Sequence, residues 1–204
     1  SPILLKLFDD NPALARQVFQ LIKQQENLFT VNRAESEVMS INQAAGRHPV
    51  GVSEAVFRLI SIAHAVSVSP GSAFNFAIGP VVKRWKIGFQ GRSVPPASEI
   101  AALLPLTDPH QVVLNQQHRS VFLQQAGMEI DLGAIAKGYI ADVVQAFLRQ
   151  HGVPQAVCKL GGNVQTRGAP MHQPQGWSIG LKKPLGADDQ LLGVLQVQGK
   201  SVVT

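Results

Sequence analysis

The stretch Glu129–Asp142, EIDLGAIAKGYIAD, is the most informative part of the sequence, because a predicted strand ends at Ile130 and a predicted helix begins at Gly133. Apolar residues at helical spacing carry that helix to Gln150, and Gly152 lies just past its end. The first backbone N–H groups of such a helix are unpaired and carry a positive partial charge, so they favour a bound anion such as a phosphate.

Two charged side chains of this stretch allow two interpretations. Lys137 lies near the start of the predicted helix, where a cation opposes the helix dipole and is easier to explain if an anion binds nearby. Asp131 stands just before the helix and can either cap it or bind a ligand. In the alternative interpretation Asp131 is only a cap and Lys137 only a surface residue. Spacing alone favours this alternative, because the stretch is not a Walker loop.

The rest of the sequence mixes helical and strand patterns without a regular βαβ alternation, which predicts an α+β fold. Capping residues and apolar spacing predict helices that begin at Asn11-Pro12, Ser36-Glu37 and Ser53, and a short helix over Ser98–Leu104. Apolar runs predict strands over residues 1–8, 112–114, 121–123, 156–160 and 178–181, and two more between Gly193 and Thr204. Residues 72–96 are predicted to be irregular, because Gly, Pro and aromatic residues are frequent there.

Composition excludes several classes of protein. The 204 residues contain one cysteine, Cys158, so neither an intrachain disulfide nor a multi-cysteine metal site can form. No apolar run reaches the roughly 18 residues that a membrane-spanning helix needs. The net charge is +5, but the basic residues are scattered and only Lys83–Lys86 forms a cluster. This pattern argues against nucleic-acid binding, whereas a modest positive field suits a small anionic ligand.

Two further segments combine glycines or small residues with a possible ligand contact. Leu160–Asn163, LGGN, follows a predicted strand and indicates either a tight turn, the commoner cause, or a backbone that lies flat against a ligand. The loop Pro70–Pro80 and the nearby Trp85 could line a planar ring or could anchor the loop to the core. The 6 histidines show no metal-binding spacing.

Four motifs in this order resemble those of the ApbE-type FAD:protein FMN transferases. They are SEVMSIN at 36–42 with Ala45-Gly46, AFN at 73–75 with Gly79-Pro80 and Trp85, DLGAIAKGY at 131–139 with Asp142, and LGGN at 160–163 with Gly168, Trp177 and Pro184. The match extends along nearly the whole chain, so residues 1–204 resemble a single flavin transferase domain. The resemblance implies two intertwined α+β halves, ApbE-like and T-fold-like, with the ligand between them.

The resemblance also implies an activity. The family's enzymes are bacterial transferases that bind and depend on magnesium. They move FMN from FAD to a Thr or Ser hydroxyl of a target flavoprotein, and this flavinylation releases AMP. The alternatives are an FAD pyrophosphatase that forms FMN and AMP, and a non-catalytic flavin-binding protein. The implied partners are FAD and the acceptor flavoprotein, and no nucleic acid. Family members are often lipid-anchored on the outer face of the inner membrane, although cytoplasmic members exist, so the compartment stays open.

Site residues are carried over position by position. The resemblance implies that FAD is bound by Asn32, Ala73, Phe74, Asn75, Asp131, Lys137, Gly161 and Gly162. It implies that the backbone carbonyl of Ala134 is one Mg²⁺ ligand, and it identifies no catalytic residue. Asn75 and Ala77 stand where the family usually has Asp and Thr. Because the family continues past Thr204 to an Asp and a Thr that complete the metal site, we expect a chain truncated at both ends that lacks its C-terminal part.

Overall fold

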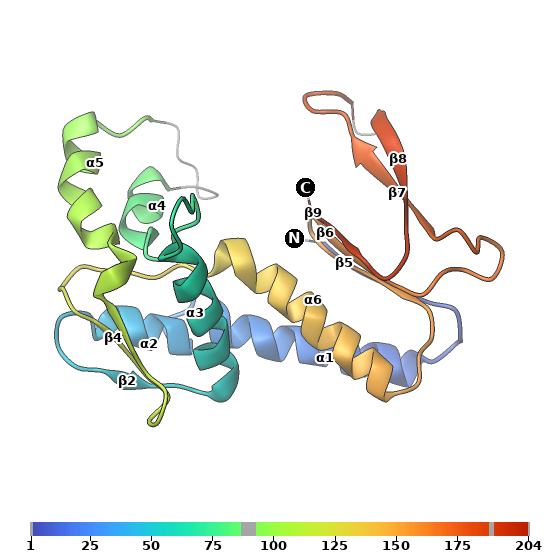
Figure 1. The fold of residues 1–204 in the computed structure, drawn as a ribbon, viewed down its shortest axis with the longest axis horizontal. Helices are drawn as coiled ribbons and strands as arrows, with labels where there is room; N and C mark the ends of the chain where they lie inside the picture. The colour runs from blue at the N-terminus through green and yellow to red at the C-terminus, as the bar shows by residue number, and fades with distance from the viewer. Residues whose placement is uncertain (1, 87–92, 188–189, 204) are drawn as a thin grey trace. The chain divides into compact units, whose positions relative to one another are not determined.

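Both ends of the chain belong to one folding unit and its middle to another. In the computed structural model, which describes residues 2–86, 93–187 and 190–203, unit 1 comprises Ser1–Gln24 and Lys137–Thr204, and unit 2 comprises Gln25–Ala136. Two helices of 18 residues each, α1 (Pro12–Phe29) and α6 (Gly133–Gln150), carry the chain from one unit to the other (Figure 1). This arrangement agrees with the predicted α+β fold of intertwined halves.

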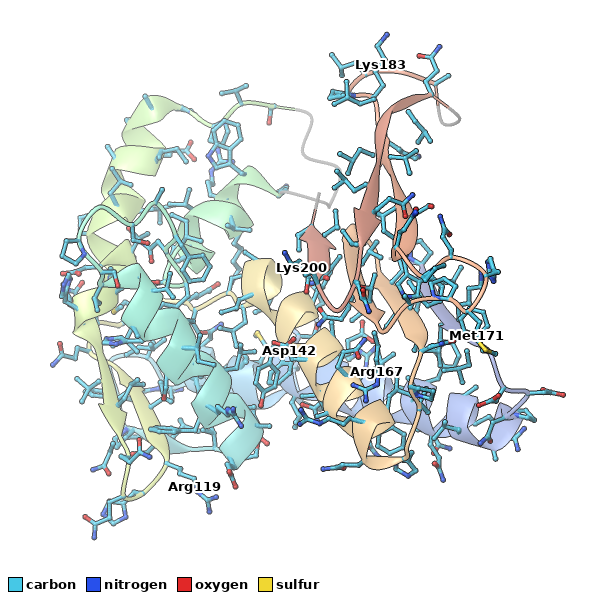
Figure 2. The ribbon with its side chains drawn as sticks, turned by 45° about the vertical axis from the view of Figure 1, so that its right-hand side comes forward. Arg119, Asp142, Arg167, Met171, Lys183 and Lys200 are labelled. Atoms are coloured by element: carbon cyan, nitrogen blue, oxygen red, sulfur yellow. The ribbon has the colours of Figure 1, made fainter. Side chains whose placement is uncertain are left out.

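Unit 1 is built on an antiparallel sheet of four strands in the order β1-β5-β6-β9. The strands are β1 (Ile3–Leu7), β5 (Ala156–Leu160), β6 (Asn163–Arg167) and β9 (Ser201–Val203). The turn before β9 is held to β6, because the N–H and the hydroxyl of Thr166 both donate to the carbonyl of Lys200, at 3.0 and 2.8 Å (Lys200 is labelled in Figure 2). The sequence predicts every strand of this sheet except β6.

A separate antiparallel hairpin of unit 1 pairs β7 (Trp177–Lys182) with β8 (Leu191–Val197). Helix α1 begins where the sequence predicts, and α6 has both of its predicted bounds. Asn11 caps α1, because its Oδ1 accepts the N–H of Leu14 at 2.9 Å, and Gly152 follows α6 with a φ of 69°. The buried face of α6 consists of Ile140, Ala141, Val144 and Leu148.

Unit 2 contains a three-stranded antiparallel sheet in the order β2-β4-β3 and four short helices. The strands are β2 (Val50–Gly51), β3 (Val112–Asn115) and β4 (Ser120–Leu123), and the helices are α2 (Glu37–Gln43), α3 (Glu54–Ser67), α4 (Gly79–Trp85) and α5 (Ala97–Leu103). Two 3-10 turns, Leu104–Thr107 and Pro109–Gln111, lead into β3. Ser36 and Ser53 cap α2 and α3 as predicted, since each hydroxyl accepts a first-turn N–H.

Two predictions from the sequence are wrong. Residues 128–132 have no regular secondary structure and belong to none of the described sheets, so no strand ends at Ile130, and the preceding strand ends at Leu123. Residues 72–96 are not wholly irregular, because α4 forms within them with Pro80 in its first turn, where a missing N–H breaks no helical hydrogen bond. Residues 87–92 of that range lie outside the described part. None of the helices among the described residues is long and apolar enough to cross a membrane.

Candidate functional site

The candidate site is built around the segment Met128–Leu132, which leads directly into α6. Its side chains alternate as in a strand: Met128, Ile130 and Leu132 are buried, whereas Glu129 and Asp131 are partly exposed. Buried backbone N–H and C=O groups need hydrogen-bond partners, and none of the strands in the described part of the chain pairs with this segment. The partners come instead from two other motifs of the sequence.

The first partner is the side chain of Asn42, at the end of α2. Its Nδ2 donates to the carbonyl of Ile130 at 3.0 Å, and its Oδ1 accepts the N–H of Ile130 at 2.8 Å. One amide therefore satisfies both backbone polar groups of a residue that is 1% exposed. The side chain pairs with the segment as a neighbouring strand would.

The second set of partners lies in the loop before α4 and at the start of that helix. The N–H of Asp131 donates to the carbonyl of Phe76 at 2.8 Å, and the N–H of Gly79 donates to the carbonyl of Glu129 at 3.2 Å. The approach at Gly79 is so close that a Cβ there would lie 2.5 Å from the Glu129 carbonyl oxygen. Three of the four motifs, at 36–46, 73–85 and 131–142, thus meet at one segment.

Asp131 holds the start of α6. Its Oδ1 accepts the N–H of Gly133, the first residue of the helix, at 2.7 Å. Asp131 therefore binds the helix start from one position before the N-cap, and its role in FAD binding stays a prediction. Gly133, Ala134 and Lys137 are exposed, so the first turns of α6 present their surface to solvent. An exposed helix start with a nearby cation is an arrangement that favours anions.

Asn75 has a structural role within unit 2. Its Nδ2 donates to the carbonyl of Thr107 at 2.8 Å, and its Oδ1 accepts the N–H of Ala77 at 2.8 Å. A carboxylate at this position could accept from Ala77 but could not donate to Thr107. The amide therefore fits this chain better than the acid that the family usually has. Phe74 is half-buried and Ala73 is exposed in the same loop.

The other predicted contacts are distributed over both units. Asn32 is exposed in a turn of unit 2, where its N–H donates to Oγ1 of Thr30 at 3.1 Å. Lys137, Gly161 and Gly162 belong to unit 1. The two glycines form the two-residue turn between β5 and β6, and Gly161 has a φ of 62°, which a side chain would disfavour. The structure thus brings Asp131 together with the loop 73–77 and assigns the turn glycines to the other unit.

Two residues within these motifs, Asn42 and Asn163, are not among the site residues predicted from the sequence. Asn42 was only one letter of a motif, and nothing in the sequence connects it to a residue 88 positions away. Asn163 follows the paired glycines, is 6% exposed, and its Oδ1 has no hydrogen-bond partner among the described atoms. Its Nδ2 lies 3.5 Å from where a Cβ on Gly138 would be. The signal that could have found Asn163 is its place directly after Gly161-Gly162.

The described residues do not fit a magnesium site by themselves. Across residues 2–86, 93–187 and 190–203, no three His, Cys, Asp or Glu side chains lie close enough together to hold a metal ion. Ala134 can offer only a backbone carbonyl, and one oxygen of Asp131 already accepts a hydrogen bond. Mg²⁺ prefers about six oxygen ligands, usually including carboxylates.

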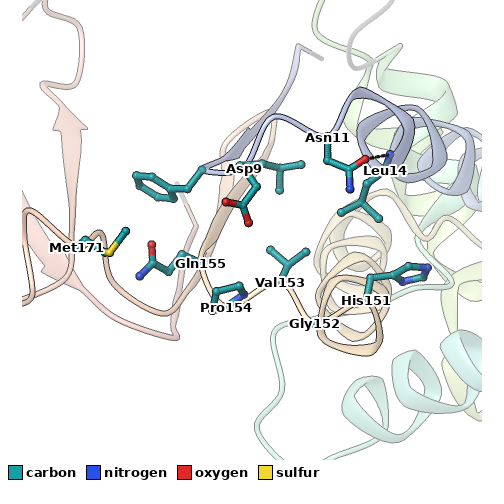
Figure 3. Close-up of a pocket in the computed structure, with 11 residues that line it drawn as sticks. Asp9, Asn11, Leu14, His151, Gly152, Val153, Pro154, Gln155 and Met171 are labelled. Carbon is teal, nitrogen blue, oxygen red and sulfur yellow. Dashed lines mark hydrogen bonds between the residues drawn. The ribbon is translucent and has the colours of Figure 1, made fainter.

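Two cavities contain none of the predicted site residues. One in unit 1 has a volume of about 250 Å³ and lies between the β1–α1 connection and the α6–β5 connection, where Asp9, His151 and Gln155 line it (Figure 3). Another in unit 2 has a volume of about 480 Å³ and is lined by polar groups that include Arg58 and Arg119.

The Cys158 thiol is not reactive at neutral pH, because burial raises its pKa to about 11.

Comparison with known proteins gives consistent results. The sequence matches the model of the ApbE family over residues 2–204. It is 59% identical to an FAD:protein FMN transferase of Klebsiella pneumoniae, covering 100% of this chain and 62% of the relative. It is 35% identical to an FAD:protein FMN transferase of Treponema pallidum, covering 94% of this chain and 56% of the relative. The chain thus spans less than two thirds of the length of these curated relatives.

Solved structures share the fold. The crystal structure of the ApbE protein from Thermotoga maritima superimposes with a TM-score of 0.86 at 25% identity, covering 98% of this chain and 64% of that chain. The flavin transferase ApbE from Vibrio cholerae gives a TM-score of 0.80 at 22% identity, covering 96% of this chain and 63% of that chain. The α+β fold is therefore confirmed over almost all of the sequence.

Proposed function

The chain belongs to the ApbE family, and from this membership we propose that the protein transfers FMN from FAD to an acceptor flavoprotein. The structural observation that supports the proposal is the meeting of three motifs at the segment Met128–Leu132, which fixes Asp131 and the start of α6. Rigid placement of backbone dipoles around a reacting group is a main source of catalysis.

The proposed reaction is phosphoryl-type transfer to a Thr or Ser hydroxyl. The hydroxyl oxygen attacks the phosphorus on the FMN side of the FAD pyrophosphate. The bond from that phosphorus to the bridging oxygen breaks, AMP leaves with the oxygen, and the hydroxyl proton passes to solvent. The products are a phosphoester between FMN and the acceptor, and free AMP.

This chain's own residues are suited to the charged part of FAD. The exposed start of α6 offers backbone N–H dipoles, and Lys137 adds a full positive charge on the same helix. Asp131 keeps the helix start in place through its hydrogen bond to Gly133. We propose that these groups bind the pyrophosphate, with Asn32 and the loop 73–75 toward the flavin and Gly161-Gly162 contributing backbone.

We propose magnesium dependence from the family resemblance alone. The described residues offer the Ala134 carbonyl but no cluster of ligating side chains, so we derive no step through the metal. The prediction is that the purified protein releases AMP from FAD with Mg²⁺ and that excess chelator stops the release. AMP release that continues unchanged in chelator would refute the metal-dependent proposal.

One experiment separates the proposed transferase from its alternatives. The purified protein is incubated with FAD, Mg²⁺ and a flavoprotein acceptor that carries an exposed Thr, and AMP, free FMN and acceptor mass are measured. A transferase forms AMP and flavinylated acceptor in equal amounts, and the mass of the acceptor rises by one bound FMN. A pyrophosphatase forms AMP and free FMN in equal amounts. A non-catalytic binding protein binds FAD but forms neither AMP nor FMN.

A further inference from the structure

We propose that Asn42 is a positioning residue of the FAD site, which sets the place of Asp131 and of the first turn of α6 through the backbone of Ile130. The proposal rests on the proposed function, because it assumes that FAD binds at this helix start. It adds a residue in α2 to a site otherwise assigned to loops, a helix start and a turn. The side chain of Asn42 makes two hydrogen bonds, both to the backbone of Ile130.

The chemistry of the contact is specific to an amide. The carbonyl and the N–H of Ile130 need a donor and an acceptor side by side, and the Asn42 amide supplies both at 3.0 and 2.8 Å. A carboxylate supplies only acceptors and an aliphatic side chain supplies neither. Because Ile130 is 1% exposed, water cannot easily replace a lost partner.

The helix that carries Asn42 is itself well anchored. Ser36 caps α2, because its hydroxyl oxygen accepts the N–H of Met39 at 3.0 Å while its hydroxyl proton is donated to the carbonyl of Thr30. Val38 and Ile41 are 0% and 1% exposed. A buried, capped helix is a rigid base, so the position of Ile130 follows the position of α2.

The contact between Asn42 and Ile130 positions Asp131 directly. It follows Ile130 in the chain, its N–H is fixed to the Phe76 carbonyl at 2.8 Å, and its Oδ1 holds the N–H of Gly133 at 2.7 Å. Loss of the Asn42 contact leaves Ile130 with two unpaired backbone groups, which favours movement of the segment. Displacement of Asp131 and of the helix start then weakens FAD binding, even where the protein stays folded.

The decisive variant is Asn42→Asp, which keeps the size of the side chain. Its carboxylate can accept from the N–H of Ile130 but repels the carbonyl, whereas the protonated carboxyl can donate to that carbonyl as the amide does. We expect FAD affinity to be about tenfold weaker than wild type at pH 8. The deficit should shrink as the pH falls toward about 5.5 and the introduced carboxyl takes up a proton. Glu129 and Asp131 are the carboxylates next to Ile130 in both proteins, so the ratio of the two affinities at each pH removes their contribution.

A matched control separates positioning from general loss of stability. Ser53→Ala removes the cap of α3, where the Ser53 hydroxyl accepts the N–H of Val56 at 3.4 Å. Within the described part of the chain, Ser53 has no hydrogen bond with residues 128–132. We expect a lower Tm but an FAD affinity within twofold of wild type. If Asn42→Asp does not fold, Asn42→Ser replaces it as the test variant. The serine is uncharged and can reach only one of the two backbone groups of Ile130. We expect its FAD affinity to be about threefold weaker than wild type at every pH.

Calorimetric titration of FAD against each purified variant gives outcomes that are distinguishable. A deficit in Asn42→Asp that disappears at low pH, with an unaffected control, supports the positioning role. If the wild type binds FAD and Asn42→Asp or Asn42→Ser binds it equally well, the positioning role is wrong and the proposed function stands. A deficit in Asn42→Asp that is the same at all pH values also overturns the role. If the wild type binds no FAD, the proposed function fails first and this inference fails with it.

Discussion

Gly79→Ala tests the close approach between α4 and the segment before α6. The added Cβ would lie 2.5 Å from the carbonyl oxygen of Glu129 and 2.8 Å from its carbonyl carbon, distances that Cβ atoms essentially never show. The obstacle is backbone, so it cannot rotate away as the end of a flexible side chain would. Relief requires α4 and the segment to separate, which weakens the 3.2 Å hydrogen bond from Gly79 to Glu129.

The expected cost combines overpacking with the loss of a buried hydrogen bond. Together these lower the free energy of unfolding by about 2–4 kcal/mol, which for a chain of this length lowers Tm by roughly 5–15 °C. Helix propensity alone predicts the opposite sign, since Ala in place of Gly in a helix is worth about 1 kcal/mol. The sign of the change therefore decides between the two effects.

Calorimetry of Gly79→Ala and of Gly51→Ala, side by side with wild type, measures the effect. Gly51 is a fair control, because it lies in a strand and a Cβ there would meet nothing within 4 Å. We expect the control to change the free energy of unfolding by at most about 0.5 kcal/mol. An unchanged or higher Tm in Gly79→Ala would refute the close approach and the hydrogen bond that depends on it.

Two further predictions concern a ligand contact and pH. Lys137→Ala is expected to weaken FAD binding about tenfold, because the proposed role of Lys137 is a charge-assisted contact. Tm should stay nearly unchanged, because Lys137 is exposed. An unchanged FAD affinity in calorimetric titration would mean that Lys137 is a surface residue only. Burial, together with the nearby His110, lowers the pKa of His64 below the ordinary value of 6.5, so the folded protein binds fewer protons than the unfolded chain as the pH falls through that value. Tm is therefore expected to fall as the pH drops from 8 toward 5, and less steeply in His64→Gln; parallel slopes for the two proteins would contradict this.

The sequence by itself determined every helix except α4 and most of the strands, because their signals are local. Asn11, Ser36 and Ser53 mark helix starts that the structure confirms, since a side-chain cap acts within one turn of the residue that provides it. The bounds of α6 are those predicted, because apolar spacing defines its buried face and Gly152 follows its end. The motifs also identified the family.

Only the tertiary structure decided how those motifs are used. The segment that ends at Ile130 looks like a strand in sequence. Whether it is a strand depends on its hydrogen-bond partners, and here the partner of Ile130 is a side chain 88 residues earlier. The turn at Gly161-Gly162 and the strand β6 depend likewise on pairing with β5 and β9. The same holds for Asn75, whose amide joins two backbone segments of unit 2. Pairing between distant segments is a property of the folded chain, because hydrogen-bond partners far apart in sequence leave no local pattern.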